Sequence, residues 1–541
     1  MKFEEYFSLE AIVGDLIRWR VKGKGTVDEK GRRDVEKVLP ERKAWSRAGV
    51  KNRKGVAPEV VRRQAIWRTV RWVCGGHRAD VTLPLRWVQN LRKLVAEVQE
   101  AVFSGNVAFE KPRMIKIAKG REGGVMQYRE VASFERLADR VILSRMTAYV
   151  RDRMEPVLSE YCYSFRKDCD VNHQLAVKRL QEFRARFPEG SLFVAECDIK
   201  KFFDSISHET VRRRWNEVGF DDASGKVLEA YLSVYAVNGH AGRVTLPGGG
   251  DCTRRGLPQG GSLSTVLANL VLAEADRAVE SVDDGRLFYA RYCDDVVFVH
   301  PDEAACRRAM EAYAAALAKL DLPMHEVRPF VYRPADGAPT AYYSIKSKGP
   351  FRWREAEKGE AGCAPWVSFL GSQVRHDGET RIRKESIKKH IRSLGRETAK
   401  AVREIEEGNV GTRAPNSMMA WFARFRNMLI AKGVGYVTAK VQDCDMCWVG
   451  AFPNVTGCAD TKMQMRRLDR VREGMLAKVW SSFVMATEDG RMVGDGRTGA
   501  RPSRRFKGKP FSYFGFLEKA VRPTNMAYRR VRTYALPYSE V

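Results

Sequence analysis

The order of apolar and polar residues along the chain predicts a mixture of helices and short strands. Apolar residues at 91, 94, 95, 98 and 102 recur with the spacing of one helix face. Residues 109–131 alternate in the manner of strands around a Gly-Gly pair, and this pattern predicts a β-hairpin. The next segment, "SFERLADRVILSRMTAYVRDRM", returns to helical spacing. The first ninety residues, with interleaved tryptophans and short apolar groups, also favour helices.

The middle of the chain, roughly residues 191 to 375, mixes short apolar strands with helices and fits an α+β domain. Its segment "AACRRAMEAYAAALAKL" (304–320) consists largely of strong helix formers. A Gly- and charge-rich stretch, 334–365, is typical of an insertion loop before "WVSFLGSQV". From about residue 376 the pattern is mostly helical and basic.

The charge balance points to a polyanionic partner. The 541 residues include 95 Lys and Arg against 67 Asp and Glu, a formal net charge of +28. Clustered cations displace the counterions of phosphate groups and so bind nucleic acid, although a basic soluble protein without such a partner is the ordinary alternative. Six of the cations lie between residues 497 and 509 without an acid among them, which predicts a phosphate-binding loop.

Other features bear on location. The N-terminus carries acids early and has no apolar core of a signal peptide, and no apolar run is long enough to span a membrane. The eleven cysteines are scattered, and one stands beside each of Asp198 and Asp294, where a disulfide would have little use. They are interpreted as reduced thiols, so the sequence predicts a cytoplasmic protein without a membrane partner.

Three segments of the middle part place acids or glycines at the ends of predicted elements. "SLFVAECDIKKFFDSISH" (191–208) is an apolar strand that ends at Asp198. "RRGLPQGGSLSTVLANLVLAEAD" (254–276) is a turn that enters a helix with apolar residues at 263, 266, 267, 270 and 271. "FYARYCDDVVFVH" (288–300) places Asp294 and Asp295 in a tight turn between two strands. Each segment alone has an ordinary reading as a turn or a cap. Adjacent carboxylates in an apolar run are costly unless they are paired or bound to a metal.

In this order and spacing the three segments resemble the palm motifs of reverse transcriptases. "DIKKFFDSI" is similar to the first catalytic motif, "GLPQGGSLS" to the nucleotide-binding turn and "YCDD" to the Tyr-x-Asp-Asp signature. "IAKG", "QYREV" and "ADR" resemble the fingers segment of the group-II-intron-like branch, "YCYSFRKDCDVNHQLAV" its next block and "FLGSQV" its primer grip. The resemblance covers about residues 109 to 390.

The resemblance implies an α+β fold of the right-hand polymerase type. Fingers and palm, with an antiparallel sheet packed on helices, would be followed by a mostly helical thumb and C-terminal region. The chain is therefore expected to have three parts: a basic helical N-terminal extension over 1–95, fingers and palm over 96–375, and a thumb-like basic region over 376–541.

The implied activity is RNA-directed DNA synthesis, in which two divalent ions about 3.5–4 Å apart stabilise the attacking and leaving oxygens. Mg2+ prefers carboxylate, phosphate and water oxygens, with Mn2+ as an alternative ion. The resemblance assigns Asp198, Asp294 and Asp295 as the metal ligands and catalytic residues. The implied partners are an RNA template or a non-coding RNA, deoxynucleoside triphosphates and the DNA product, with a second copy of the chain or a partner protein left open.

The same resemblance assigns a nucleotide-binding set. Phe203 stands where the family carries a bulky aromatic residue against the sugar 2′ position, whereas the neighbouring Phe202 is better explained as a core residue. Gln259 corresponds to the glutamine that contacts the incoming nucleotide, and Gly260 lets backbone approach closely. Lys119 and Arg129 would hold the triphosphate, or would be solvated charges of the hairpin.

Some positions depart from the family pattern. Thr265 stands where proline is usual, "IAK" replaces Ile-Pro-Lys, and Cys293 replaces the common alanine of the Tyr-x-Asp-Asp signature. Arg328 in "LPMHEVRPF", a loose fourth palm motif, stands where lysine is usual. None of these changes removes a catalytic group.

The motifs that the sequence carries and those that it lacks favour one branch of the reverse transcriptase family. The sequence shows no two-pair Cys module or His-rich nuclease of a group II intron protein, and no Asn-Ala-x-x-His stretch of a retron enzyme. "RRLDRVREGMLAKVW" and "GKPFSYFGFLEKA" are similar to the C-terminal stretches of stand-alone bacterial reverse transcriptases, many of which act in antiphage defence. A group II intron-type or retron-like enzyme, an RNA-binding splicing helper, and untemplated or protein-primed synthesis stay open as alternatives.

Overall fold

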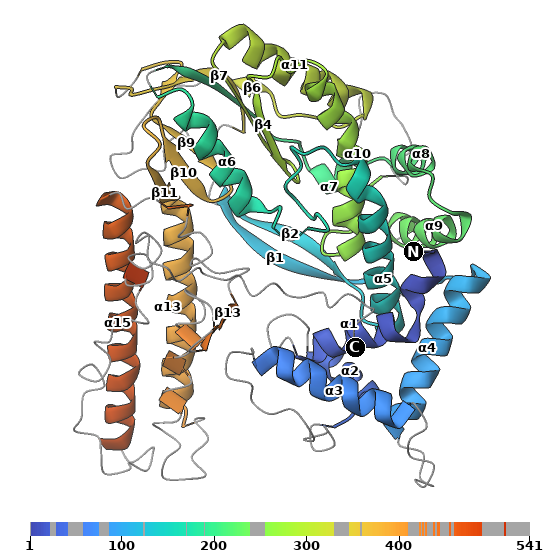
Figure 1. Ribbon diagram of the computed structural model, residues 1–541. Helices are drawn as coiled ribbons and strands as arrows, with labels where there is room; N and C mark the ends of the chain where they lie inside the picture. The colour runs from blue at the N-terminus through green and yellow to red at the C-terminus, as the bar shows by residue number, and fades with distance from the viewer. Residues whose placement is uncertain are drawn as a thin grey trace. The chain divides into compact units, whose positions relative to one another are not determined.

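The computed structural model (Figure 1) describes eighteen stretches of the chain. They are residues 2–21, 29–41, 58–74, 86–122, 125–168, 170–188, 190–237, 255–328, 346–357, 360–408, 421–422, 425–426, 428–429, 436–438, 441–443, 454–455, 459–488 and 513–514.

The chain divides into two compact units. The first contains residues 1–176, 190–352 and 356–363, and the second contains residues 177–189, 353–355 and 364–541. The N-terminal helices thus belong to the same unit as most residues of the predicted fingers and palm, whereas residues 177–189, 353–355 and 364–375 belong to the second unit. The boundaries expected from the sequence at residues 95 and 375 stay a prediction.

A six-stranded sheet forms the centre of the predicted palm. Its strands run in the order β4 (Phe288–Tyr292), β5 (Asp295–His300), β3 (Leu192–Cys197), β7 (Ser347–Trp353) and β6 (Val327–Arg328), and β8 (Cys363–Ala364) pairs with β7 off this path. The pairs β4–β5 and β3–β5 are antiparallel, as expected. The pair β6–β7 is parallel, so the sheet is mixed rather than wholly antiparallel.

Strand β7 corrects one expectation from the sequence. The stretch 334–365 was expected to be an insertion loop, but its residues 347–353 form a strand of this sheet. Ser347 and Lys348 at its start are buried, and the Lys348 ammonium pairs with the Glu196 carboxylate on β3. A charged residue can occupy the interior of a sheet when it has such a partner. Residues 334–345 and 358–359 of the expected loop lie outside the described residues.

Two long helices cover the sheet. Helix α11 (Glu303–Lys319) packs against β3 and β5, and it also packs against α10 (Ser262–Glu280). Helix α10 in turn packs against α5 (Leu137–Met154) and α8 (His208–Val218). The apolar positions predicted for one face of α10 are all buried, namely Leu263, Val266, Leu267, Leu270 and Val271. The helix predicted over 304–320 is confirmed to within one residue.

The predicted fingers hairpin is also confirmed. Strands β1 (Arg113–Glu122) and β2 (Val125–Ser133) pair antiparallel, with a shift of register between Ala118 and Gly120. The ribbon follows helix α4 (Arg86–Ser104), whose apolar face is buried as its spacing predicted. Figure 1 shows the hairpin as a long two-stranded ribbon.

The N-terminal helices are part of the core of the first unit. They are η1 (Phe3–Phe7), α1 (Leu9–Val21), α2 (Glu29–Val38) and α3 (Pro58–Cys74). The Tyr6 hydroxyl donates to Asp152 Oδ2 at 2.8 Å, and the buried Asp15 carboxylate pairs with Arg145 of α5 at 2.5 Å. The expectation of helices in this segment is therefore confirmed for the described residues.

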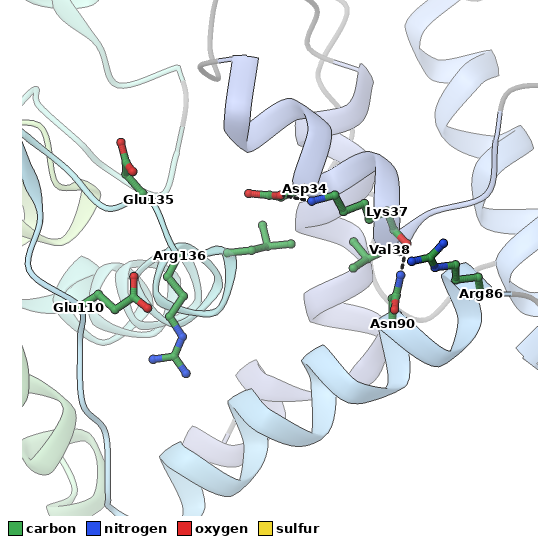
Figure 2. Close-up of a pocket in the computed structure, with 9 residues that line it drawn as sticks. Asp34, Lys37, Val38, Arg86, Asn90, Glu110, Glu135 and Arg136 are labelled. Atoms are coloured by element: carbon green, nitrogen blue, oxygen red, sulfur yellow. Dashed lines mark hydrogen bonds and ion pairs between the residues drawn. The ribbon is translucent and has the colours of Figure 1, made fainter.

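A cavity of about 540 Å³ lies beside these helices, where α2 and α4 face the start of α5 (Figure 2). The Lys37 ammonium lies 3.0 Å from Asp34 Oδ1, and Asn90 Nδ2 donates to the Lys37 carbonyl oxygen at 3.0 Å. Arg136, at the start of α5, pairs with Glu97 of α4. The Asn90–Lys37 contact joins α4 to α2, and the Arg136–Glu97 pair joins the start of α5 to α4. The residues that line the cavity include none of the predicted site residues.

The second unit is built on two long helices. Helices α13 (Lys384–Glu406) and α15 (Ala459–Glu488) pack on each other through a core that includes Leu394, Ile405, Val479, Trp480 and Phe483. A three-stranded antiparallel sheet consists of β9 (Trp366–Phe369), β10 (Ser372–Arg375) and β11 (Thr380–Ile382). The basic segment 497–509 lies outside the described residues.

The remaining elements are short or link these parts. They are η4 (Glu155–Val157), α6 (His173–Ala185), α7 (Phe202–Ser205), α9 (Asp222–Val237), β12 (Tyr436–Thr438) and β13 (Val441–Asp443). Among the helices that the structure describes, none has the length and apolar content needed to cross a bilayer.

Candidate active site

The pairing of three strands brings together the acids that the sequence singled out. Cys197 is the last residue of β3 and pairs with Val296 of β5, so Asp198 follows it beside the start of β5, where Asp295 stands. Tyr292 of β4 pairs with Asp295, which leaves Cys293 and Asp294 as the two-residue turn between these strands. The three predicted carboxylates therefore meet at one end of the central sheet.

The electrostatics of this cluster are those of mutually repelling carboxylates. Removal of water by the surrounding protein raises the pKa of Asp294, and the nearby Asp198 carboxylate raises it further. The pKa of Asp295 rises to about 6, first from the same loss of water and then from the charges of Asp294, Asp198 and Glu196. The charge of Asp198 thus disfavours ionisation of both Asp294 and Asp295, so a bound cation would relieve the repulsion.

A lysine and a histidine lie at the edge of the cluster, and burial lowers the pKa of His325 so that the lysine is the cation of the two. The Lys346 Nζ atom lies 3.4 Å from Asp198 Oδ2, and the His325 Nε2 atom lies 3.8 Å from the same oxygen. The backbone of Asp198 is held on both sides, since its N–H donates to Ser347 Oγ at 3.1 Å and its carbonyl accepts from His325 N–H at 2.9 Å. Strand β7 and the segment before β6 thus position the first acid.

The donor set fits Mg2+ in its chemistry. All three side chains offer carboxylate oxygens, the hard ligands that Mg2+ prefers, and their mutual repulsion favours a cation between them. Within the described part of the chain, no three His, Cys, Asp or Glu side chains form a ready-made group for one ion. Mg2+ usually takes only one or two carboxylates and completes its shell with substrate phosphate and water, so the three acids would share the ions with the substrate.

The predicted nucleotide-binding turn is docked on the fingers hairpin. The Gln259 carbonyl accepts from the Ala132 N–H of β2 at 2.7 Å, and Gln259 Nε2 donates to Asp204 Oδ1 at 3.4 Å. Gly260 has φ +97°, and a Cβ atom there would lie 2.3 Å from Val131 Cγ1. Glycine is therefore required at position 260 because strand β2 lies so close to it. The sequence alone did not indicate this reason.

The two phenylalanines after Asp198 have different surroundings. Phe202 is buried in the core, as expected, whereas Phe203 is only half-buried. The Phe203 carbonyl accepts from Leu257 N–H at 2.8 Å, so its backbone is fixed against the nucleotide-binding turn. The Phe203 ring packs against the core but stays partly exposed, so it is available to a ligand, whereas the buried ring of Phe202 is not.

The two predicted triphosphate cations lie on the hairpin. Arg129 is exposed on β2, and its charge partly opposes the rise in the pKa of Asp294, so Arg129 lies within electrostatic reach of the acids. Lys119 lies on β1 at the shift of register, and its side chain is outside the described residues.

Comparison with known proteins finds a family model that matches the segment around this site. Residues 126–327 match the family model described as "Reverse transcriptase (RNA-dependent DNA polymerase)". The chain carries a reverse transcriptase domain. The matched segment contains all three acids, the nucleotide-binding turn and most of β2. The match confirms the α+β right-hand polymerase class expected from the sequence. The sheet differs from the expectation only in its β6–β7 pair, which is parallel and not antiparallel.

Curated relatives match over part of their length. Protein YkfC of Escherichia coli is 28% identical over 145 residues, which are 26% of this chain and 35% of that protein. The retrovirus-related Pol polyprotein from the type-1 retrotransposable element R2 of Popillia japonica is 24% identical over 182 residues, 32% of this chain and 24% of that protein. The chain thus spans about a third or less of the length of these relatives.

The solved structures that match this chain include two telomerases. Telomerase from Candida albicans in complex with a fragment of telomeric RNA matches with a TM-score of 0.36 at 12% identity, over 81% of this chain and 76% of that one. Apo telomerase from Candida tropicalis, truncated from the C-terminal domain, matches with a TM-score of 0.35 at 11% identity, over 71% and 82% of the two chains.

Two residues of the reverse transcriptase domain and its flank escaped the sequence reasoning. His325 lies in the loose fourth palm motif and Lys346 lies at the end of the expected loop, and both reach Asp198. His325 was visible in a quoted motif but had no assigned role. Lys346 offered no local signal, because its position depends on β7 pairing with a strand about 150 residues earlier.

Proposed function

We propose that this chain is an RNA-directed DNA polymerase, a nucleotidyltransferase that adds deoxynucleotides to a primer. The observation that carries the proposal is the meeting of Asp198, Asp294 and Asp295 at one end of the central sheet, inside a matched reverse transcriptase domain. An RNA-binding splicing helper would have no use for three clustered carboxylates, which repel the phosphates that such a protein must bind.

The acids would hold Mg2+, with Mn2+ as an alternative ion. When bound, two divalent ions supply electrostatic stabilisation of the attacking primer oxygen and of the leaving pyrophosphate. Asp198 is held by β7 and the His325 backbone, while Asp294 and Asp295 are held by the β4–β5 turn. The protein thus fixes the carboxylates on strands rather than on long loops, which suits a site that needs fixed geometry.

Other residues would bind and select the nucleotide. Arg129, exposed and within electrostatic reach of Asp294, would bind the triphosphate together with Lys119. Gln259 would contact the nucleotide from a turn that Gly260 allows to dock against β2. The half-buried Phe203 ring would exclude a ribose 2′-hydroxyl and so favour deoxynucleotides.

The polymerase is tested with a primed RNA template. The purified protein should incorporate labelled deoxynucleotides into a product that is complementary to the template, sensitive to DNase and resistant to RNase. Incorporation without regard to template sequence would support untemplated synthesis instead. Absence of incorporation with Mg2+ or Mn2+ on any primed template would contradict the proposal.

We further propose that the template is a dedicated non-coding RNA, that the basic N-terminal and C-terminal parts bind it, and that the enzyme acts in the cytoplasm in antiphage defence. The net charge of +28 and the resemblance of residues 466–480 and 508–520 to stand-alone bacterial enzymes support this proposal. Sequencing of copurified RNA and of the DNA product, with phage plating on cells that express the protein, tests it. Recovery of the protein's own intron RNA, with no change in plating, would favour a mobile element.

A further inference from the structure

A fully buried ion pair lies directly behind the turn that carries Asp294 and Asp295. The side chains of Arg291 on β4 and Asp276 on α10 both have 0% exposure. Arg291 Nε donates to Asp276 Oδ1 at 2.7 Å and Nη2 donates to Oδ2 at 2.5 Å. Tyr289, also on β4, donates its hydroxyl proton to Asp276 Oδ1 at 2.7 Å. Replacing a buried ion pair by apolar side chains is often neutral or stabilising, so such a pair invites a reason beyond stability.

The third nitrogen of the Arg291 guanidinium binds the turn, which gives the ion pair a role beyond stability. This nitrogen, Nη1, donates to Asn269 Oδ1 at 2.9 Å and to the carbonyl oxygen of Cys293 at 3.3 Å. Cys293 is the first residue of the turn and immediately precedes Asp294. The buried guanidinium therefore donates a hydrogen bond to the backbone of the turn that carries the acids.

Ser164 binds the other backbone polar group of Cys293, its N–H. The Cys293 N–H donates to Ser164 Oγ at 3.0 Å, and Ser164 Oγ donates to Asn269 Oδ1 at 3.1 Å. Asn269 Nδ2 donates in return to the Ser164 carbonyl oxygen at 2.7 Å. The segment that carries Ser164 is itself fixed to β4, since Arg291 N–H donates to Tyr161 O at 2.8 Å. Both backbone polar groups of Cys293 are thus bound by buried side chains.

The conformation of Cys293 explains why this support is needed. Its φ is +60°, in the left-handed region that favours glycine, and a positive φ at the first central residue belongs to both primed hairpin turns. A residue with a side chain stays in this region when the surrounding structure holds it there. Without the contacts from Ser164 and Arg291, the turn would be free to relax, and the carboxylates of Asp294 and Asp295, which follow Cys293 directly, would move away from Asp198.

We propose that Ser164, Asn269, Asp276 and Arg291 form a positioning network that holds the Cys293 backbone so that Asp294 and Asp295 face Asp198. The network touches neither substrate nor ion and acts through the turn. Its effect on catalysis rests on the proposed polymerase function, whereas its effect on the placement of the carboxylates does not.

The test is the substitution Ser164→Ala, which removes one oxygen and leaves the Arg291–Asp276 pair in place. The matched control is Ser224→Ala, because Ser224 is also fully buried and its hydroxyl also donates to a carbonyl, that of Asp221 at 2.7 Å at the start of α9. Two quantities are measured for each protein, namely Mn2+ affinity without nucleic acid, by electron paramagnetic resonance, and the Mg2+ dependence of primer extension. Melting temperatures are recorded in parallel.

Ser164→Ala should weaken Mn2+ binding about tenfold and raise the Mg2+ concentration for half-maximal extension by a similar factor. Ser224→Ala should leave both unchanged even where it lowers the melting temperature. Equal ion affinities for Ser164→Ala and wild type would overturn the positioning role. An inactive wild-type protein would contradict the polymerase proposal alone, because the Mn2+ measurement still decides the role of the network.

Discussion

Replacement of Gly260 by alanine should uncouple the nucleotide-binding turn from the fingers hairpin. Gly260 has φ +97°, and the new Cβ atom would lie 2.3 Å from Val131 Cγ1 and 3.1 Å from the Ala132 carbonyl oxygen. Gly285 provides the matched control, because it has φ +83° but nothing within 4 Å of a Cβ atom. The two substitutions share the backbone penalty and differ in the clash.

The contacts around the two glycines determine how much more Gly260→Ala should cost than Gly285→Ala. Positive φ costs an L residue about 1–2 kcal/mol in either variant. Overpacking against β2 adds about 1–3 kcal/mol in Gly260→Ala alone. If the turn moves to relieve the clash, the Ala132–Gln259 hydrogen bond of 2.7 Å is lost and Gln259 is displaced. The added energy corresponds to a loss of about 5- to 150-fold in kcat/KM for the deoxynucleotide.

The assay is steady-state primer extension at varied deoxynucleotide concentration. Gly260→Ala should lose kcat/KM by this factor, and Gly285→Ala should lower only the melting temperature. Adding Val131→Ala to Gly260→Ala should recover most of the loss, because the remaining Val131 Cβ position lies 3.7 Å away. Activity of Gly260→Ala within twofold of wild type, or no recovery in the double variant, would refute the coupling.

Two further predictions concern selectivity and RNA binding. Phe203→Ala should admit ribonucleotides, whereas Phe202→Ala should mainly reduce stability. Incorporation assays with both nucleotide types and melting curves measure these effects. A wild type that already accepts ribonucleotides would contradict the assignment of Phe203. Neutralising the six cations of 497–509 (Arg497, Arg501, Arg504, Arg505, Lys507 and Lys509) should weaken RNA binding and reduce the slope of log affinity against log salt by about 0.7–0.9 per lost phosphate contact, with less effect on a short primer–template. An unchanged salt slope would mean that the RNA is bound elsewhere.

The sequence predicted the elements whose pattern is local. The spacing of apolar residues in α10 and α4 and the alternation of the fingers hairpin are properties of short segments, and the structure confirms them. The acids could be expected together because strand ends and a tight turn were each visible in the sequence. Their meeting depends on the antiparallel pairing of β3 with β5, which the resemblance to a family supplied.

What escaped prediction depends on partners far away in sequence. Strand β7 has little apolar alternation, and its Lys348 is buried only because Glu196 lies on a distant strand. The positioning network joins residues from 164 to 291 in the same way. A sequence signal did exist, since Asp276 and Arg291 are charged residues within or at the end of apolar runs, and burial of either one requires the other.

The substitution Asp294→Asn tests the central claim most directly, because it removes one carboxylate charge with almost no change of volume. Primer extension on a primed RNA template is measured for this variant, for wild type and for Asp222→Asn, an exposed aspartate at the start of α9. We predict that Asp294→Asn lowers the rate at least about a hundred- to thousandfold, with melting temperature and RNA affinity preserved, and that Asp222→Asn matches wild type. A rate for Asp294→Asn close to that of wild type would contradict the assignment of the three acids as the catalytic centre.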